Sequence, residues 1–355
     1  MTAKKLSFYQ LLQLNPVQLN QLILATNDLK KRRYYKNIIL IRSILLVTFA
    51  MLFIIISTLL FGKENASIAV AFFCILLQAQ FVGYDYNIKA TLLNFAIICL
   101  IMGLSGAIVP KLPALMGLLV NFGLLFTITI MTCDNPQMGN VGIYAFAYLF
   151  ATYFPTTSVH DLQMRLLQVF CGFILCGLIL YQKHRTQFRD RQFSTVIKNY
   201  SFKEEKCRWQ FRLAFGISLG LFIGQACHLP RYFWVGVASL SILSPYKLQL
   251  KSRMLQRIVG IIIGSCIFGV IYTILPRSLD TIMGPLGGFL VGFTTTYHWN
   301  TVFNCFGALV LASAIYGNGF SVGLRIFNNI LGCVISALFI LGFTYITRHK
   351  YHCDD

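Results

Sequence analysis

Acidic residues are scarce in this chain. It has eleven Asp and Glu against thirty Lys and Arg in 355 residues, which gives a formal net charge of +19. None of the acidic residues lies near the middle of a long apolar run. The sequence therefore offers few groups for carrying a proton across a membrane, because such a carrier must titrate inside the pathway.

Several functional signatures are also missing. The eleven cysteines contain no C-x-x-C pair and the six histidines are scattered, so we expect no disulfide framework and no metal site. There is no Gly-x-x-x-x-Gly-Lys-[Ser/Thr] loop, which excludes nucleotide hydrolysis by a P-loop. No nucleophile with a neighbouring base stands out, so we expect neither an enzyme nor a cofactor.

Hydrophobic residues, in contrast, are abundant. They make up 57% of the chain, with a mean hydropathy of +0.68, which is more than one soluble core can bury. The sequence predicts an all-α membrane protein with about twelve transmembrane helices. The expected spans are 38–61, 66–81, 90–109, 112–131, 141–154, 162–181, 213–226, 232–243, 254–275, 281–296, 302–316 and 322–346. Several are shorter than the ~20 residues that cross hydrocarbon, so tilted or broken helices are expected there.

The two halves of the chain resemble each other. Matching features are Arg42 with Arg212, Pro110 with Pro276, residues 140–151 with 300–311, and Arg165 and Gly172 with Arg325 and Gly332. Six spans in each copy would give both copies the same orientation, related by a pseudo-twofold axis along the membrane normal. We therefore predict two parallel six-helix repeats, and transporters commonly keep their pathway at such an axis.

Charge and repeat together predict the domains and the topology. The expected parts are a basic N-terminal segment 1–37, a first unit 38–181, a charged linker 182–211, a second unit 212–347 and a tail 348–355. Basic residues gather in the first segment, the linker and the tail. The positive-inside rule places these three parts in the cytoplasm of a multi-pass protein of the cell membrane. This explains the charge better than nucleic-acid binding does, and we expect no cleavable signal peptide.

Two polar segments carry helix-start signals. Asn15 is placed to cap a helix whose first residue is Pro16. That helix would lie on the inner leaflet, with the basic run 30–36 holding anionic lipids; a solvated charge run without such a role is the alternative. In the linker, Ser201 and Glu204 have the spacing of a capping box at the start of the helix that leads into the seventh span.

Arg165 and Arg325 are the first candidates for an anion pathway. Both lie a few residues inside the expected outer end of the last span of their repeat. Arginine inside a membrane is costly and usually faces a partner or a water-filled cavity, and guanidinium groups bind carboxylates and phosphates in bidentate fashion. The alternative is that each side chain reaches the outer interface or pairs locally, Arg165 with Asp161.

A second set of polar residues is weaker evidence. Arg257 stands before Gly260 and Gly264 in an Arg-x-x-Gly-x-x-x-Gly pattern, which favours close helix packing beside a cation. We also assign Asn329 to the anion pathway, although interhelical hydrogen bonding is the more common role of such an asparagine. Asp134 and His298 occupy comparable connections between the fourth and fifth spans of each repeat, and we take them as the candidates for proton coupling.

One long stretch resembles a known family. It runs from Arg212 through Leu229, Pro230, Arg231, Tyr232, Phe233, Trp234 and Val235 to Pro245, then Arg253, Arg257, Gly260 and Gly264. This stretch resembles the fusaric acid resistance family of aromatic acid exporters, and more distantly the plant aluminium-activated malate transporters. The resemblance implies an inner-membrane exporter or channel for organic anions. It maps the family's basic motif onto Arg253 and Arg257, and its last-span motif onto Arg325 and Gly332.

Together these observations predict a transporter that moves an organic or lipid-linked anion, such as an aromatic carboxylate, across the cytoplasmic membrane. Export is the direction that the resemblance implies. The alternative is a non-transporting envelope protein that binds or presents anionic lipids through its basic inner surface. We expect anionic membrane lipids as partners and no nucleic acid. The sequence allows a homo-oligomer and does not identify the substrate or the coupling ion.

Overall fold

The computed structural model describes residues 6–136, 140–245 and 250–351, and within them it is helical with no strand. A helix lies at each of the twelve apolar runs. In chain order these are α3 (Leu29–Phe61), α4 (Ala66–Ala79), α5 (Ile88–Ile108), α6 (Ala114–Thr132), α7 (Asn140–Tyr153), α8 (Val159–His184), α10 (Glu205–Ala226), α11 (Phe233–Leu243), α12 (Leu250–Ile274), α13 (Met283–Val291), α14 (Tyr297–Tyr316) and α15 (Asn318–Tyr351). Among the described residues, three short α-helices lie outside these runs: α1 (Phe8–Gln13), α2 (Pro16–Ala25) and α9 (Phe193–Lys198). The predicted all-α class is confirmed.

Seven helices in the described part of the chain are long and apolar enough to cross a membrane, namely α3, α5, α6, α8, α12, α14 and α15. The protein is therefore a multi-pass membrane protein. The helices α4, α7, α11 and α13 have only 14, 14, 11 and 9 residues, as the short apolar runs predicted. These four helices are shorter than the ~20 residues that cross the hydrocarbon core of a membrane. Twelve membrane crossings and two six-helix repeats therefore stay predictions.

The chain divides into two compact units. Unit 1 consists of Met1–Leu52 and Lys251–Phe327, and unit 2 consists of Phe53–Leu250 and Asn328–Asp355. Helices α10 and α11, from the second half of the sequence, thus belong to the same unit as α4 to α8. The boundaries of the two compact units lie at residues 52, 250 and 327. The predicted boundaries at 181 and 212 describe the repeat in the sequence and not these units.

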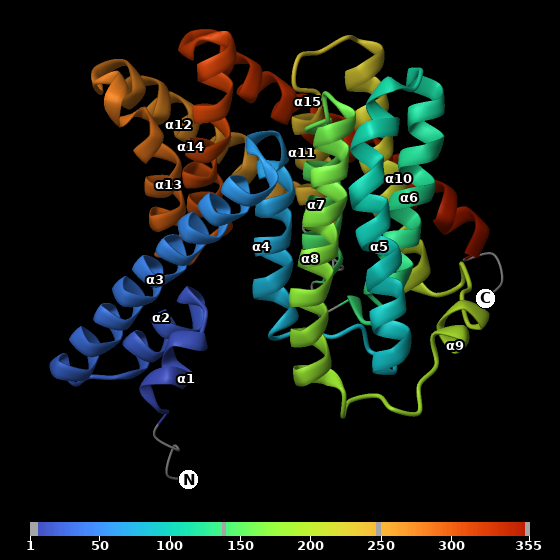
Figure 1. The fold of residues 1–355 in the computed structure, drawn as a ribbon, viewed down its shortest axis with the longest axis horizontal. Helices are drawn as coiled ribbons and strands as arrows, with labels where there is room; N and C mark the ends of the chain where they lie inside the picture. Colours follow the sequence, from blue (N-terminus) through green and yellow to red (C-terminus); the bar gives the residue numbers. More distant parts are fainter. Residues whose placement is uncertain (1–5, 137–139, 246–249, 352–355) are drawn as a thin grey trace. The chain divides into compact units, whose positions relative to one another are not determined.

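Unit 2 is a bundle in which α5 packs against α7 and α8, α4 packs against the same two helices, and α10 packs against α6 and α11 (Figure 1). Two glycines allow close approaches in this bundle. A Cβ on Gly172 of α8 would lie 2.6 Å from the Phe72 ring of α4, and one on Gly332 of α15 would lie 2.6 Å from Ala238 Cβ of α11. The last helix of each sequence half therefore meets the second helix of that half at a matching glycine.

In unit 1, α12 packs on α14 through two glycines. A Cβ on Gly260 would lie 3.0 Å from the carbonyl oxygen of His298, and one on Gly264 would lie 2.3 Å from that of Val302. The close packing that the Arg-x-x-Gly-x-x-x-Gly pattern predicted is confirmed. Unit 1 also holds α2, which begins at Pro16 with Asn15 as its N-cap, as predicted.

Candidate functional site

Arg165 is completely buried in α8 and is held by three hydrogen bonds. Its Nε donates to Asn65 Oδ1 at 3.0 Å, Nη1 to the carbonyl of Ala151 at 3.0 Å, and Nη2 to the carbonyl of Phe154 at 2.6 Å. The two carbonyls lie at the C-terminal end of α7, where the helix dipole is negative and backbone acceptors lack partners. The guanidinium therefore caps α7.

The surroundings of Arg165 show local pairing, with partners other than the Asp161 that the sequence suggested. The side chain does not reach the interface, because it has no exposed surface. Asp161 does not pair with it; the Asp161 carboxylate accepts from Thr157 Oγ1 and from the backbone N–H of Ser158 instead. Gly106 of α5 provides the space, since a Cβ there would lie 2.2 Å from Arg165 Nη1.

Arg325 and Asn329 are also buried, with 6% and 1% of their surfaces exposed. Arg325 lies about two turns into α15, as Arg165 lies about two turns into α8. The two arginines belong to different units, so their predicted convergence on one axis stays a prediction. The neighbouring Asn328 has a structural role: its Nδ2 donates to the carbonyl of Pro230 at 3.0 Å.

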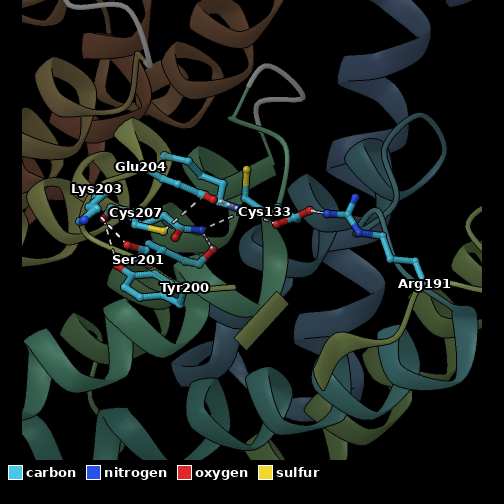
Figure 2. Close-up of polar contacts among 11 residues, drawn as sticks. Cys133, Arg191, Tyr200, Ser201, Lys203, Glu204 and Cys207 are labelled. Carbon is cyan, nitrogen blue, oxygen red and sulfur yellow. Dashed lines mark hydrogen bonds and ion pairs between the residues drawn. The ribbon is translucent and has the colours of Figure 1, made fainter. Parts of the chain in front are cut away.

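Asp134 lies in the connection between α6 and α7, and the linker binds it from two sides. Arg191 Nη2 contacts Asp134 Oδ2, and Lys206 Nζ lies 2.9 Å from Asp134 Oδ1. Figure 2 shows Arg191 on one side of Cys133 and the linker segment with Glu204 and Cys207 on the other. Because two cations of the linker contact this carboxylate, the geometry gives Asp134 the role of fastening the linker to the helix bundle.

The linker does not form the predicted capping box. The helix α10 begins only at Glu205, and its N-cap Glu204 makes no side-chain cap. Ser201 Oγ instead accepts from the backbone N–H of Lys203 at 3.3 Å, a local turn that competes with helix formation. Glu204 Oε2 lies 3.5 Å from Lys206 Nζ. Because Lys206 also contacts Asp134, Glu204 belongs to the polar cluster around Asp134.

The structure places a second carboxylate in this cluster. Asp85, in the loop between α4 and α5, is only 5% exposed and has a positive φ of 61°. Burial raises the pKa of Asp85, and the negative charge of Asp134 raises it further. The predicted site omitted Asp85, although both loops were expected on the cytoplasmic side, where they would be close neighbours.

A column of polar side chains runs along α7 and was also missed. Asn140, Tyr144, Tyr148 and Thr152 are at most 1% exposed. Tyr148 Oη donates to Asn121 Oδ1 at 2.7 Å, and Thr152 Oγ1 donates to Ser105 Oγ at 2.8 Å, while Asn140 Nδ2 donates to the carbonyls of Gly83 and Thr132. The signal in the sequence was the four-residue spacing, which places all of them on one face of a helix.

In unit 1, two arginines of α12 share one tyrosine of α14. The Arg253 guanidinium lies over the Tyr297 ring, 4.2 Å from its centroid, and Arg257 Nη1 donates to Tyr297 Oη at 3.3 Å. Arg257 is 6% exposed. His298, the next residue along α14, contacts the carbonyl of Gln256 through Nδ1 at 3.3 Å. The structure thus brings Arg257 and His298 together from the predicted site residues.

The part of the chain that contains Arg257 and His298 is similar to a known family. The family model described as fusaric acid resistance protein-like matches residues 218–339. Residues 218–339 are thus similar to that family. The resemblance seen in the sequence is confirmed for these residues, whereas the distant likeness to aluminium-activated malate transporters is not. A search of curated proteins and a search of solved structures each found no match.

The matched region divides the candidate residues. Arg257, His298, Arg325 and Asn329 lie inside it, whereas Arg165 and the Asp134 cluster lie outside. Arg253 and Arg257 of α12 therefore lie inside the region that matches the family, and both contact Tyr297.

Proposed function

We propose that this membrane protein transports organic anions across the cell membrane, with export as the direction. The apolar helices and the fusaric acid resistance protein-like region fit a membrane transporter in general. The observation that carries the choice of an anion is the pair Arg253 and Arg257 around Tyr297.

The chemistry of this pair favours a carboxylate. Arg253 and Arg257 lie one helical turn apart on α12 and approach the same ring, so their like charges repel. A carboxylate placed between them would relieve that repulsion and accept bidentate hydrogen bonds. Tyr297 offers an aromatic face and a hydroxyl beside the charges, which suits an aromatic carboxylate.

The family resemblance favours export, and the location of the pair fits that direction. Arg253 and Arg257 lie in the first turns of α12, which the predicted topology puts at the cytoplasmic side. An anion leaving the cytoplasm would meet these cations first. In this proposal Arg325, which belongs to the same unit as the pair, contacts the anion further along the path, and the anion contact of Asn329 stays a prediction. The three hydrogen bonds of Arg165 to the protein support a structural role for that residue, so its anion contact stays a prediction.

Coupling to a proton gradient has a separate basis. His298 adjoins Tyr297, and histidine is a common side chain of proton relays, so it is the coupling candidate beside the cation pair. Asp134 is held by Arg191 and Lys206, which favours a structural role for it. The transport proposal itself requires neither residue.

The test is anion flux in proteoliposomes that contain the purified protein, with benzoate and malate as probes. Arg257→Gln should lower benzoate flux about tenfold or more, the loss expected for one charge-assisted hydrogen bond. Arg277→Gln is the matched control, because Arg277 is an exposed arginine of the same unit. Equal flux for Arg257→Gln and the parent would remove Arg257 from the pathway.

The same preparation tests the alternative. Absence of flux for both probes by a folded parent protein, together with anionic lipid retained through purification, would refute transport of these anions and favour a lipid-presenting protein. A parent protein that moves benzoate would exclude the non-transporting role.

A further inference from the structure

The first residues described form a pair of short capped helices, α1 and α2. Ser7 and Gln10 make a capping box at α1, and Asn15 and Gln18 make another at α2, with Pro16 at the first helical position. Helices of 6 and 10 residues are marginal by themselves. Their stability must therefore come from these caps and from what the helices pack against.

One face of the pair packs on the first turns of α3. The buried residues Leu11, Leu19 and Ile38 form a hydrophobic cluster with 3%, 0% and 1% exposure. Arg32 of α3 adds a polar contact, because its Nε donates to the carbonyl of Thr26 at 2.7 Å. These contacts fix the pair at the place where the apolar run of α3 begins, which is the level of the membrane interface.

The other face exposes large apolar side chains. Phe8, Tyr9, Val17, Leu24 and Leu29 have 49%, 67%, 44%, 70% and 78% of their surfaces exposed. A set of this size, supplied by two short helices and the first residue of α3, is unfavourable in water and marks an interaction surface. At the interface level, aromatic and aliphatic side chains of this kind enter the boundary between headgroups and acyl chains.

Charge identifies the partner. Lys30, Lys31, Arg33 and Lys36 are exposed at the start of α3, next to the apolar face. Asp28 is the only acidic residue among residues 1–61. A basic cluster beside an apolar interfacial face is complementary to anionic phospholipids, whereas a protein partner would need to supply matching acidic groups as well as an apolar surface.

We propose that the α1–α2 pair is an interfacial anchor that embeds its apolar face in the leaflet where α3 begins and binds anionic phospholipid headgroups through the four lysine and arginine residues. By the predicted topology this is the cytoplasmic leaflet. The anchor goes beyond the transport function, since it concerns the lipids that surround the protein and not the transported anion.

The test uses the full-length protein in vesicles of equal parts phosphatidylglycerol and phosphatidylcholine. A photo-crosslinking p-benzoylphenylalanine replaces Leu24 in one variant and Arg189, an exposed residue of the linker, in the control. Mass spectrometry then identifies the adducts. We expect lipid adducts at position 24 at several times the control level, with phosphatidylglycerol enriched at least twofold over phosphatidylcholine.

The role of the charges is tested in the same crosslinking background. Replacing Lys30, Lys31, Arg33 and Lys36 with Gln should return the captured lipid to the composition of the vesicle. A matched variant that removes four exposed linker cations, Lys183, Arg185, Arg189 and Lys198, should keep the enrichment. Protein adducts in place of lipid at position 24, or no phosphatidylglycerol preference in the parent, would overturn the proposal. Because adduct formation needs no solute flux, this result is independent of the transport assay.

Discussion

Replacing Gly264 with Ala tests how α12 and α14 hold the arginine pair. The added Cβ would lie 2.3 Å from the carbonyl oxygen of Val302 and 2.8 Å from its Cα. Ordinary contacts of a Cβ begin at 3.4 Å, and the obstacle is backbone, so the two helices must separate by about 1 Å. That movement would pull Tyr297 away from Arg257, whose hydrogen bond at 3.3 Å is already long.

The expected cost combines two opposing effects. Overpacking of this kind costs about 1–3 kcal/mol, and replacing glycine with alanine in a helix returns about 1 kcal/mol. Gly307 of α14 is the matched control, because a Cβ there would meet no atom within 4 Å. We therefore expect Gly307→Ala to be neutral or stabilising, and Gly264→Ala to be less stable than Gly307→Ala by about 1–3 kcal/mol.

The measurement is the free energy of unfolding in mixed micelles, from denaturant titrations followed by tryptophan fluorescence, together with benzoate flux. Gly264→Ala should lose flux as well as stability, whereas Gly307→Ala should keep both. If Gly264→Ala matched Gly307→Ala in stability, the close approach of α12 to α14 and the packing argument for the motif would both be wrong.

Two further predictions concern unit 2. Arg165→Leu leaves Asn65 Oδ1 and two carbonyls of α7 without their donor, so it should lower the free energy of unfolding by at least about 3 kcal/mol; a loss below about 1 kcal/mol would contradict the capping role. Asp85→Asn should stabilise the protein at pH 7, because burial raises the pKa of Asp85 and penalises its ionised form. The loss of stability caused by ionised Asp85 begins as the pH rises above the unfolded-state pKa of an aspartate, about 3.9. It is complete once the pH exceeds the raised pKa of Asp85 in the folded state. The gain should therefore vanish below about pH 4 in melting curves, and Asp85→Ala should gain less, since alanine disfavours a φ of 61°.

The helices could be predicted from the apolar runs, because segments of this hydropathy have no other stable form in a membrane. Their ends were harder to place. The helix α3 begins at Leu29, before the expected 38, because its basic residues are good helix formers that extend beyond the apolar part. Glycines Gly62 and Gly317 follow α3 and α14 with positive φ angles of 87° and 79°, a conformation that composition alone does not reveal.

The candidate site shows a similar limit. The packing of Gly260 and Gly264 followed from the physics of helix contact in apolar surroundings, whereas for Arg165 the sequence left both a partner and the outer interface open. The partners of Arg165 did not follow, since Asn65 is distant in sequence and two of its acceptors are backbone carbonyls that leave no trace in side-chain identity. Long-range pairing through backbone atoms is what the pattern of residues could not predict.

The polar side chains of α7 restrict how that helix can move. Asn140, Tyr144, Tyr148 and Thr152 recur every fourth residue and are buried. A screw motion of α7 by one residue would rotate this face by about 100°. Acceptors such as Asn121 Oδ1 would then face hydrocarbon side chains, where a missing hydrogen bond costs free energy. An alternating-access movement in unit 2 must therefore carry α7 as one rigid piece with the helices that satisfy its polar groups. The sliding surfaces would then lie at the edges of this bundle and not within it.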